Sequence, residues 1–195
     1  MRRRPAVVLD VDGEMASQNI KDRYALLAGH LGISVASSLQ IVAADWQEGF
    51  IPRLDTPEGQ ADLEPFVDNA DLIFFDNRSC LFDPEGESDP GARQPAQDYL
   101  LSLRRRGKAV MLAHHSNRQG GARGHRKPED PMNLLINLTR PEGYSHEQGA
   151  RFVVTFEKSR GAYGAAVAPF TAQRTADGWK TVTPGRELSR RRQAD

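Results

Sequence analysis

The chain has 195 residues, of which 38% are hydrophobic and 27% are charged, and its 26 basic residues balance its 26 acidic residues. This composition is typical of a folded globular protein, and it excludes a disordered chain and a globally basic nucleic-acid-binding protein. A single cysteine, Cys80, excludes a disulfide framework, and no apolar run reaches the roughly 20 residues of a membrane span. We therefore expect a cytoplasmic protein without a membrane partner.

Short apolar runs alternate with segments of helical periodicity in the first part of the chain. Such alternation predicts a parallel sheet covered by helices on both faces. Ser17 is a candidate cap for the first helix, and Gly32 is its expected end. Strands are expected at 6–9, 39–43, 72–75 and 109–113, helices from 17, 57 and 96, and loops at 83–95 and 116–131.

The pattern changes in the last part of the chain. Residues 134–138, 151–156 and 167–172 read as strands separated by turns, without a helix between them. This predicts an antiparallel β-meander that extends the parallel sheet or caps its edge. We expect one core over residues 1–185, followed by a basic, disordered tail at 186–195.

Polar side chains gather where three of the expected parallel strands end. Ligands of open α/β sheets bind at the carboxyl ends of the strands, and carboxylates there suit a hydrated Mg²⁺ and an activated water. Solvated strand ends also carry polar residues without any function. The residues concerned are Asp10, Asp12 and Glu14, then Asp76 and Asn77, then His114, His115, Ser116 and Asn117.

Four segments in order resemble motifs of RecA-like hexameric helicases of the plasmid RepA type. They are the strand motif at 8–15, a Walker B-like strand at 71–76, a sensor-like strand and loop at 110–124, and a Lys-x-Arg segment at 156–161. The resemblance covers about residues 7–172. It implies a RecA-like three-layer fold with a C-terminal antiparallel β-meander, and Mg²⁺-ATP hydrolysis coupled to DNA.

The resemblance also implies a role for each matching position. Glu14 would polarise the attacking water, and Asp76 would hold Mg²⁺ through water. His114 or His115 would sense the γ-phosphate of ATP. Adjacent residues of a strand point to opposite faces, so at most one of these histidines faces the nucleotide directly.

Basic residues complete the implied site. Arg123 would be an arginine finger that reaches the nucleotide of a neighbouring subunit in a hexameric ring. Lys158 and Arg160 would assist at the same interface, on the strand face that continues from Phe152 through Phe156. Single-stranded DNA is a further expected partner, contacted by Arg118, Arg126 and Lys127.

The chain departs from this family in one respect. No Gly-x-x-x-x-Gly-Lys-Ser/Thr segment occurs, and the Gly107-Lys108 pair lacks the earlier glycine. Because the backbone amides and lysine of such a loop hold the phosphates, we expect this chain to lack the family's first strand, phosphate loop and first helix. Its own binding of ATP would then be impaired.

Two other functions fit the sequence. Residues 9–13, Leu-Asp-Val-Asp-Gly, resemble the first motif of haloacid-dehalogenase-type phosphatases, with Asp10 as nucleophile and Asp12 as acid/base. Glu14 and the early position of the 71–76 strand depart from that family. Alternatively, the chain is a non-enzymatic DNA-binding protein or an inactive partner in an oligomer, with contacts through Arg123 and Arg126.

Overall fold

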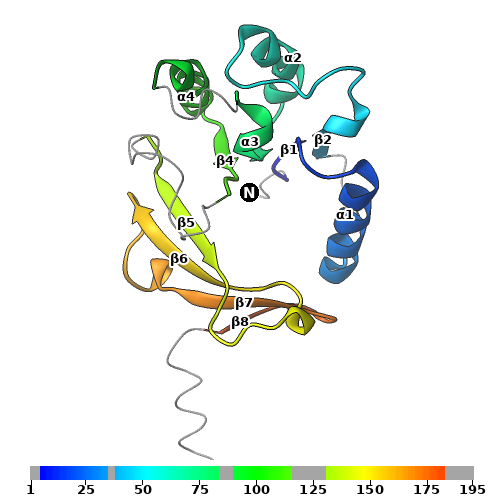
Figure 1. The fold of residues 1–195 in the computed structure, drawn as a ribbon, viewed down its shortest axis with the longest axis vertical. Coiled ribbons are helices and arrows are strands. Elements are labelled where there is room, and N and C mark those ends of the chain that lie inside the picture. Colours follow the sequence, from blue (N-terminus) through cyan, green and yellow to red (C-terminus); the bar gives the residue numbers. More distant parts are fainter. Residues whose placement is uncertain (1–4, 35–37, 84–89, 116–130, 183–195) are drawn as a thin grey trace, which may run out of the picture. The chain divides into compact units, whose positions relative to one another are not determined.

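The chain forms two compact units, Met1–Arg126 and Lys127–Asp195, in a computed structural model that describes residues 5–34, 38–83, 90–115 and 131–182 (Figure 1). The described residues contain one parallel sheet, in the first unit, and one antiparallel sheet, in the second. The protein is therefore a mixed α/β chain, as the sequence predicts. Its meander forms a separate sheet and does not extend the parallel one.

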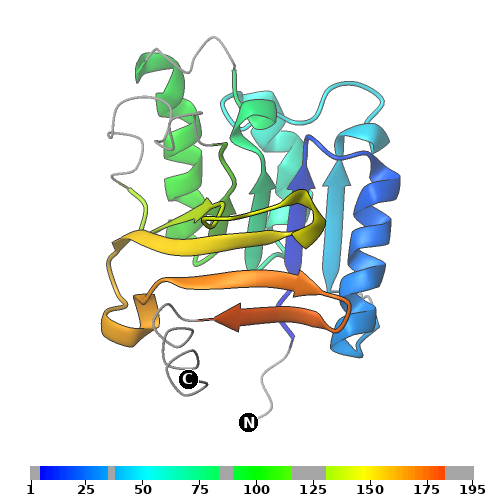
Figure 2. The same ribbon diagram turned by 60° about the horizontal axis from the view of Figure 1, so that its bottom comes forward.

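The first unit is built on four parallel strands that lie side by side in Figure 2. They run in the order β2-β1-β3-β4, so β1 and β3 are central. Asp12 at the end of β1 lies opposite Ala43 on one side and Asp76 on the other. The strands are β1 (Val8–Asp12), β2 (Leu39–Ala43), β3 (Leu72–Asp76) and β4 (Ala109–Leu112).

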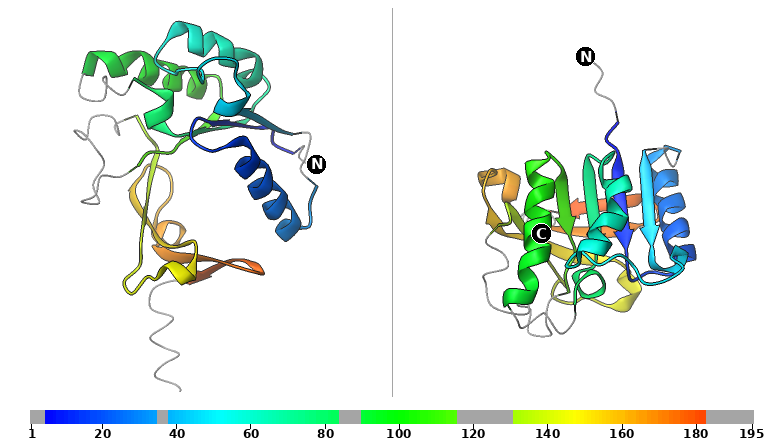
Figure 3. Two further views of the ribbon diagram at one scale, coloured as in Figure 1. Left: turned by 45° about the vertical axis from the view of Figure 1, so that its right-hand side comes forward. Right: turned by 90° about the horizontal axis from the view of Figure 1, so that it is seen from above.

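Helices lie on both faces of this sheet, as the left view of Figure 3 shows. One face carries α2 (Pro57–Val67), α3 (Arg78–Leu81) and α4 (Pro90–Arg105), and the other carries α1 (Ser17–Leu31). The first helix ends as predicted, because Gly32 adopts a left-handed conformation with φ 63°. Its start differs, since Ser17 donates its backbone N–H to Asp45 Oδ2 (2.8 Å) and does not cap the helix.

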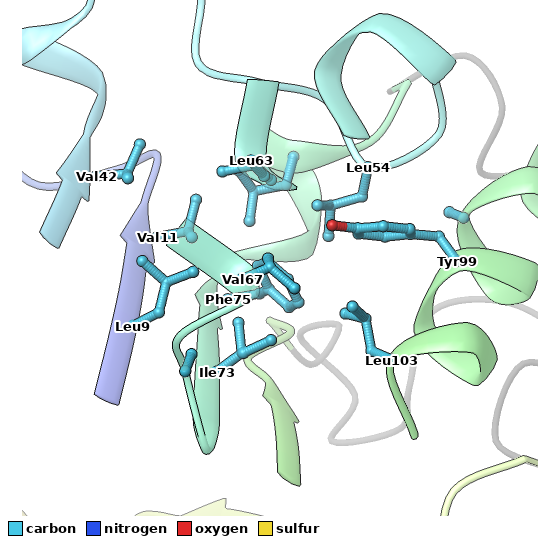
Figure 4. Close-up of a cluster of buried hydrophobic side chains, with 13 residues drawn as sticks. Leu9, Val11, Val42, Leu54, Leu63, Val67, Ile73, Phe75, Tyr99 and Leu103 are labelled. Carbon is cyan, nitrogen blue, oxygen red and sulfur yellow. The ribbon is translucent and has the colours of Figure 1, made fainter. Parts of the chain in front are cut away.

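The core lies between the sheet and the helices α2 and α4 (Figure 4). Each fully buried leucine or phenylalanine there contributes roughly 1.5–3 kcal/mol through removal from water. The other face is covered more thinly, because Ile20 is the buried residue of α1 while Leu31 is 69% exposed. The core side chains include Leu9, Val11, Leu54, Leu63, Val67, Ile73, Phe75, Tyr99 and Leu103.

Two helical segments differ from the sequence prediction. The loop predicted at 83–95 is helical from Pro90 onward, within the residues that the structure describes. The short helix α3 directly after β3 was not predicted. Asn77 caps it by accepting the Ser79 backbone N–H at 2.9 Å. None of the described helices is both long and apolar enough to traverse a bilayer.

The second unit is an antiparallel meander in the order β5-β6-β7-β8. The strand predicted at 167–172 begins later, because Pro169 has no N–H for a ladder hydrogen bond. The last strand was not predicted. The strands are β5 (Leu134–Thr139), β6 (Arg151–Ser159), β7 (Phe170–Thr175) and β8 (Gly178–Val182).

A register shift interrupts the pairing of β5 with β6 between Leu135 and Ile136. Ile136 pairs with Phe156, whereas Leu135 pairs with Lys158, so β6 carries one extra residue at this point. A bulge of this kind breaks the two-residue alternation of side chains. The expectation that Lys158 and Arg160 simply continue the face of Phe156 is therefore wrong.

Candidate functional site

Polar groups meet at the carboxyl edge of the parallel sheet. β1 ends at Asp12 and β3 ends at Asp76, and these two residues lie directly opposite each other in the register. Ala113 after β4 accepts the backbone N–H of Arg78 through its carbonyl oxygen at 2.9 Å, which brings the third chain segment to the same edge. The sheet therefore holds the ends of three neighbouring strands together.

The turn after β1 is shaped by Asp12, which is 1% exposed. Its Oδ1 accepts the backbone N–H groups of Glu14 at 2.9 Å and of Met15 at 2.8 Å. Gly13 donates its own N–H to the carbonyl oxygen of Asp76 at 2.6 Å. These bonds tie the turn to β3 and fix the backbone that carries Glu14.

Three side chains from three strand ends form one hydrogen-bonded group. Asn77 Nδ2 donates to Glu14 Oε2, and it lies 3.1 Å from His115 Nε2. The same ring nitrogen lies 3.2 Å from Glu14 Oε2. The structure thus brings Glu14 and His115, one histidine of the pair, together at this edge. The Asp76–Asn77 peptide bond that precedes this group is cis.

Asp76 lies in an environment that disfavours its charged form. Burial raises the pKa of this carboxyl, and the negative charges of Asp12 and Glu14 raise it further, while His115 and Arg23 act in the opposite direction. An added cation would relieve this repulsion. The carboxylate-rich edge therefore carries a local excess of negative charge that suits a divalent metal ion.

Asp10 forms a second buried carboxyl on the face covered by α1. It is 5% exposed, and its Oδ2 accepts a hydrogen bond from the Tyr24 hydroxyl at 2.8 Å. No residue in the described part of the chain bonds its buried Oδ1. Burial raises the pKa of Asp10 to about 6, the Tyr24 hydrogen bond opposes this, and the charges of Asp12 and Asp76 add to it.

The carboxylates at this edge suit Mg²⁺ better than zinc or calcium. Within the residues that the structure describes, no three His, Cys, Asp or Glu side chains form a group able to hold a metal ion. A zinc or calcium cage requires such a group. Mg²⁺ instead keeps several waters and takes one or two carboxylates together with substrate phosphates. Asp76 is the carboxylate of this edge that could serve in such an arrangement, because Asp12 is buried and accepts two backbone N–H groups.

Gly13 has no room for a side chain, which gives a direct test of this geometry. A Cβ at Gly13 would lie 2.6 Å from Cys80 Cβ, so Gly13→Ala must push the turn away from α3. We expect a loss of about 1–3 kcal/mol in the free energy of unfolding, measured by urea denaturation. Gly29→Ala is the matched control. It lies in α1 with nothing within 4 Å of the added Cβ, and it should be neutral or stabilising. Equal stability of Gly13→Ala and the unaltered chain would contradict this packing.

The other predicted site residues belong to the second unit or lie outside the described residues. Lys158 is in β6, and Arg160 follows it, donating its backbone N–H to the Asn133 carbonyl oxygen at 2.9 Å. Both belong to the second unit. The predicted arginine finger and the predicted DNA contacts lie outside the described residues, as does the tail at 186–195. These residues are Arg118, Arg123, Arg126 and Lys127.

Two residues of the site were not among the predicted functional residues. The sequence indicates Asn77 only as a polar strand end, although Asn is also a favoured residue at helix caps. Tyr24 lies at helical spacing from Ile20 and Leu27, a pattern typical of an apolar helix face. Its hydroxyl was the available signal, because a buried tyrosine usually needs a hydrogen-bond partner.

Comparison of the sequence with protein-family models and with curated proteins found no match.

Proposed function

We propose that this chain supplies the water-activating and metal-binding part of a RecA-like Mg²⁺-ATPase of the plasmid replicative-helicase kind. The single observation that carries the proposal is the meeting of Glu14, Asn77 and His115 beside Asp76 at one edge of the sheet. Hydrolysis of a phosphoanhydride needs a carboxylate to orient water and a cation to offset the developing charge. In this proposal Glu14 is the carboxylate that orients water, and Asp76 would hold the cation.

Glu14 is suited to polarise a water molecule. Its Oε2 is engaged by Asn77 and lies near His115, while its Oε1 has no hydrogen-bond partner in the described part of the chain. The side chain is 49% exposed, so water reaches it. One oxygen is thus fixed in place and the other is left to accept a proton from water.

Asp76 is the residue that would hold Mg²⁺ in this proposal. The metal would supply charge neutralisation for the phosphate groups. The phosphate cradle itself is the missing part, since no Gly-x-x-x-x-Gly-Lys-Ser/Thr segment occurs in the 195 residues. We propose that this cradle comes from a segment outside them. Coupling to single-stranded DNA, a hexameric ring and a cytoplasmic location belong to the same proposal and rest on the resemblance alone.

The phosphatase alternative fits the structure less well. A nucleophilic aspartate must reach the phosphorus atom of its substrate. Asp10 and Asp12 are 5% and 1% exposed, and both are engaged by Tyr24 or by backbone N–H groups. We therefore do not propose this activity.

Binding of a non-hydrolysable ATP analogue, measured by calorimetry with and without Mg²⁺, tests the proposal. The protein to use is a version extended upstream in its source gene, with residues 1–195 alone for comparison. We expect Asp76→Asn to weaken the Mg²⁺-dependent binding about tenfold or more, because the metal loses its carboxylate. The matched control is Asp62→Asn, an exposed carboxylate of α2, which should change nothing.

The other outcomes are equally informative. If residues 1–195 alone bind the analogue tightly, the phosphate site lies within them and the proposed external cradle is wrong. If neither version binds, the ATPase proposal falls. Salt-dependent binding of single-stranded DNA without nucleotide would then favour the non-enzymatic alternative.

A further inference from the structure

Asn77 connects three parts of the site through one amide group. The side chain is buried, with 2% exposure. Its Oδ1 accepts the backbone N–H of Ser79 at 2.9 Å, which caps α3. Its Nδ2 donates to Glu14 Oε2 and lies 3.1 Å from His115 Nε2.

The helix cap determines which way the Asn77 amide points. A backbone N–H can only donate, so the atom that faces Ser79 must be the carbonyl oxygen of the amide. The NH₂ group therefore faces Glu14 and His115. It has two hydrogens, one for the carboxylate and one for the ring nitrogen.

This orientation selects a tautomer of His115. When the Asn77 amide donates to Nε2, that nitrogen is an acceptor, and the neutral imidazole carries its proton on Nδ1. No hydrogen bond to Nδ1 is formed by the described residues, and the ring is 68% exposed. The Nδ1–H group is thus available to a ligand.

We infer that Asn77 is a positioning residue that assigns separate tasks to Glu14 and His115. It holds Glu14 Oε2, which leaves Oε1 to accept a proton from water. It also keeps the His115 proton on Nδ1, as a donor to an anionic ligand such as a phosphate oxygen. The tasks of water activation and phosphate sensing rest on the function proposed above.

Without the amide the two side chains would engage each other. His115 Nε2 lies 3.2 Å from Glu14 Oε2, close enough to donate to it once Asn77 no longer donates to the ring. The proton would then sit on Nε2. His115 would lose its free donor, and Glu14 would lose the fixed orientation that the amide provides.

The tautomer of His115 is a direct readout, measured from the ¹⁵N chemical shifts of its ring at a pH where the ring is neutral. Asn77→Asp and Asn77→Ser both retain an oxygen for the Ser79 N–H, since Asp and Ser are good helix caps, and both lack the amide. We expect the Nδ1–H form to dominate in the unaltered chain. Each variant should shift the tautomer ratio toward Nε2–H by roughly two- to tenfold, which is the change in an equilibrium ratio expected when one hydrogen bond is lost.

Urea unfolding of both variants verifies that the fold persists, and Asn137→Asp, at an exposed side-chain hydrogen bond of β5, is the matched control. In the upstream-extended protein, we expect the ATPase kcat to fall 10- to 100-fold in the Asn77 variants, on the order expected for a misplaced catalytic group, with KM nearly unchanged. An unchanged tautomer ratio in Asn77→Ser would overturn the inference. Absence of ATPase activity in the unaltered extended protein would overturn the proposed function, while the ¹⁵N result would still decide the role of Asn77.

Discussion

Glu14→Gln should abolish most ATP hydrolysis while leaving ATP binding intact. Glutamine has the same shape, and its carbonyl oxygen still accepts the Asn77 hydrogen bond that fixes the side chain. The amide cannot take a proton from water. Since general-base catalysis contributes typically 10²–10⁴-fold, we expect kcat to fall at least about 100-fold. Steady-state phosphate release by the upstream-extended protein measures this loss.

A matched substitution separates the role of Glu14 from a general charge effect. Glu48→Gln also removes one carboxylate, from an exposed position after η1 (Ala44–Trp46). It should leave kcat within about twofold, because solvent and salt screen an exposed charge. If Glu14→Gln retains full activity, Glu14 does not activate the water, and another carboxylate of this edge must be sought.

Glu14→Gln also distinguishes water activation from the phosphatase alternative. In an enzyme that used Asp10 as a nucleophile, attack would occur on the phosphorus atom, and Glu14 would take no part in forming the covalent bond. Loss of ATP hydrolysis in Glu14→Gln with unchanged nucleotide affinity is therefore specific to water activation. Parallel losses of binding and of turnover would instead indicate a collapsed site.

The parallel sheet was predictable because its strands are short apolar runs between polar residues. Residues 72–75 are all apolar and end at Asp76, and β3 occupies Leu72–Asp76. The strand ends that carry the site follow from this pattern, since parallel strands end at one edge. Local composition thus indicated that Glu14, Asp76 and His115 follow strands that end at one edge.

Other features depend on contacts that no local pattern records. The choice of His115 over His114 depends on how the chain leaves β4. The contact of Tyr24 with Asp10 depends on how α1 crosses the sheet. The register shift in β6 comes from pairing with β5, because either strand alone would alternate regularly. In these cases tertiary pairing outweighs the sequence period.

Asn77 is a further case in which two local signals compete. Asn is disfavoured within strands and favoured at helix caps, and the sequence shows a strand ending at this point. The apolar run predicts the strand, but the four-residue helix after it is too short to show a periodicity of its own. The capping bond nevertheless determines the orientation of the amide in the site.

Asp10→Asn should stabilise the protein at neutral pH and have much less effect in acid. Burial raises the pKa of Asp10 from 3.8 to about 6, so the folded protein binds its proton more tightly than the unfolded chain does. The stability that this carboxyl contributes is fully present below about pH 4 and is lost as the pH rises through about 6. The shift corresponds to at most about 3 kcal/mol. Urea unfolding at about pH 4 and about pH 7 measures the difference.

The surroundings of Asp10 explain why its charged form is disfavoured. Tyr24 donates to Oδ2, but the buried Oδ1 has no hydrogen-bond partner among the described residues. In Asp10→Asn the carbonyl oxygen retains the Tyr24 bond. Asp22→Asn removes an exposed carboxylate of α1 and should change stability equally at both pH values.

Two results would contradict this account of Asp10. An Asp10→Asn effect of equal size at both pH values would mean that the carboxyl ionises as it does in water and is not buried. Hydrolysis of an aryl phosphate by the unaltered chain with Mg²⁺, lost in Asp10→Asn, would make Asp10 a nucleophile and favour the phosphatase alternative. Burial both raises the pKa of Asp10 and keeps its oxygens away from a substrate phosphorus atom. The pH dependence of stability tests the first effect of burial, and the phosphatase assay tests the second.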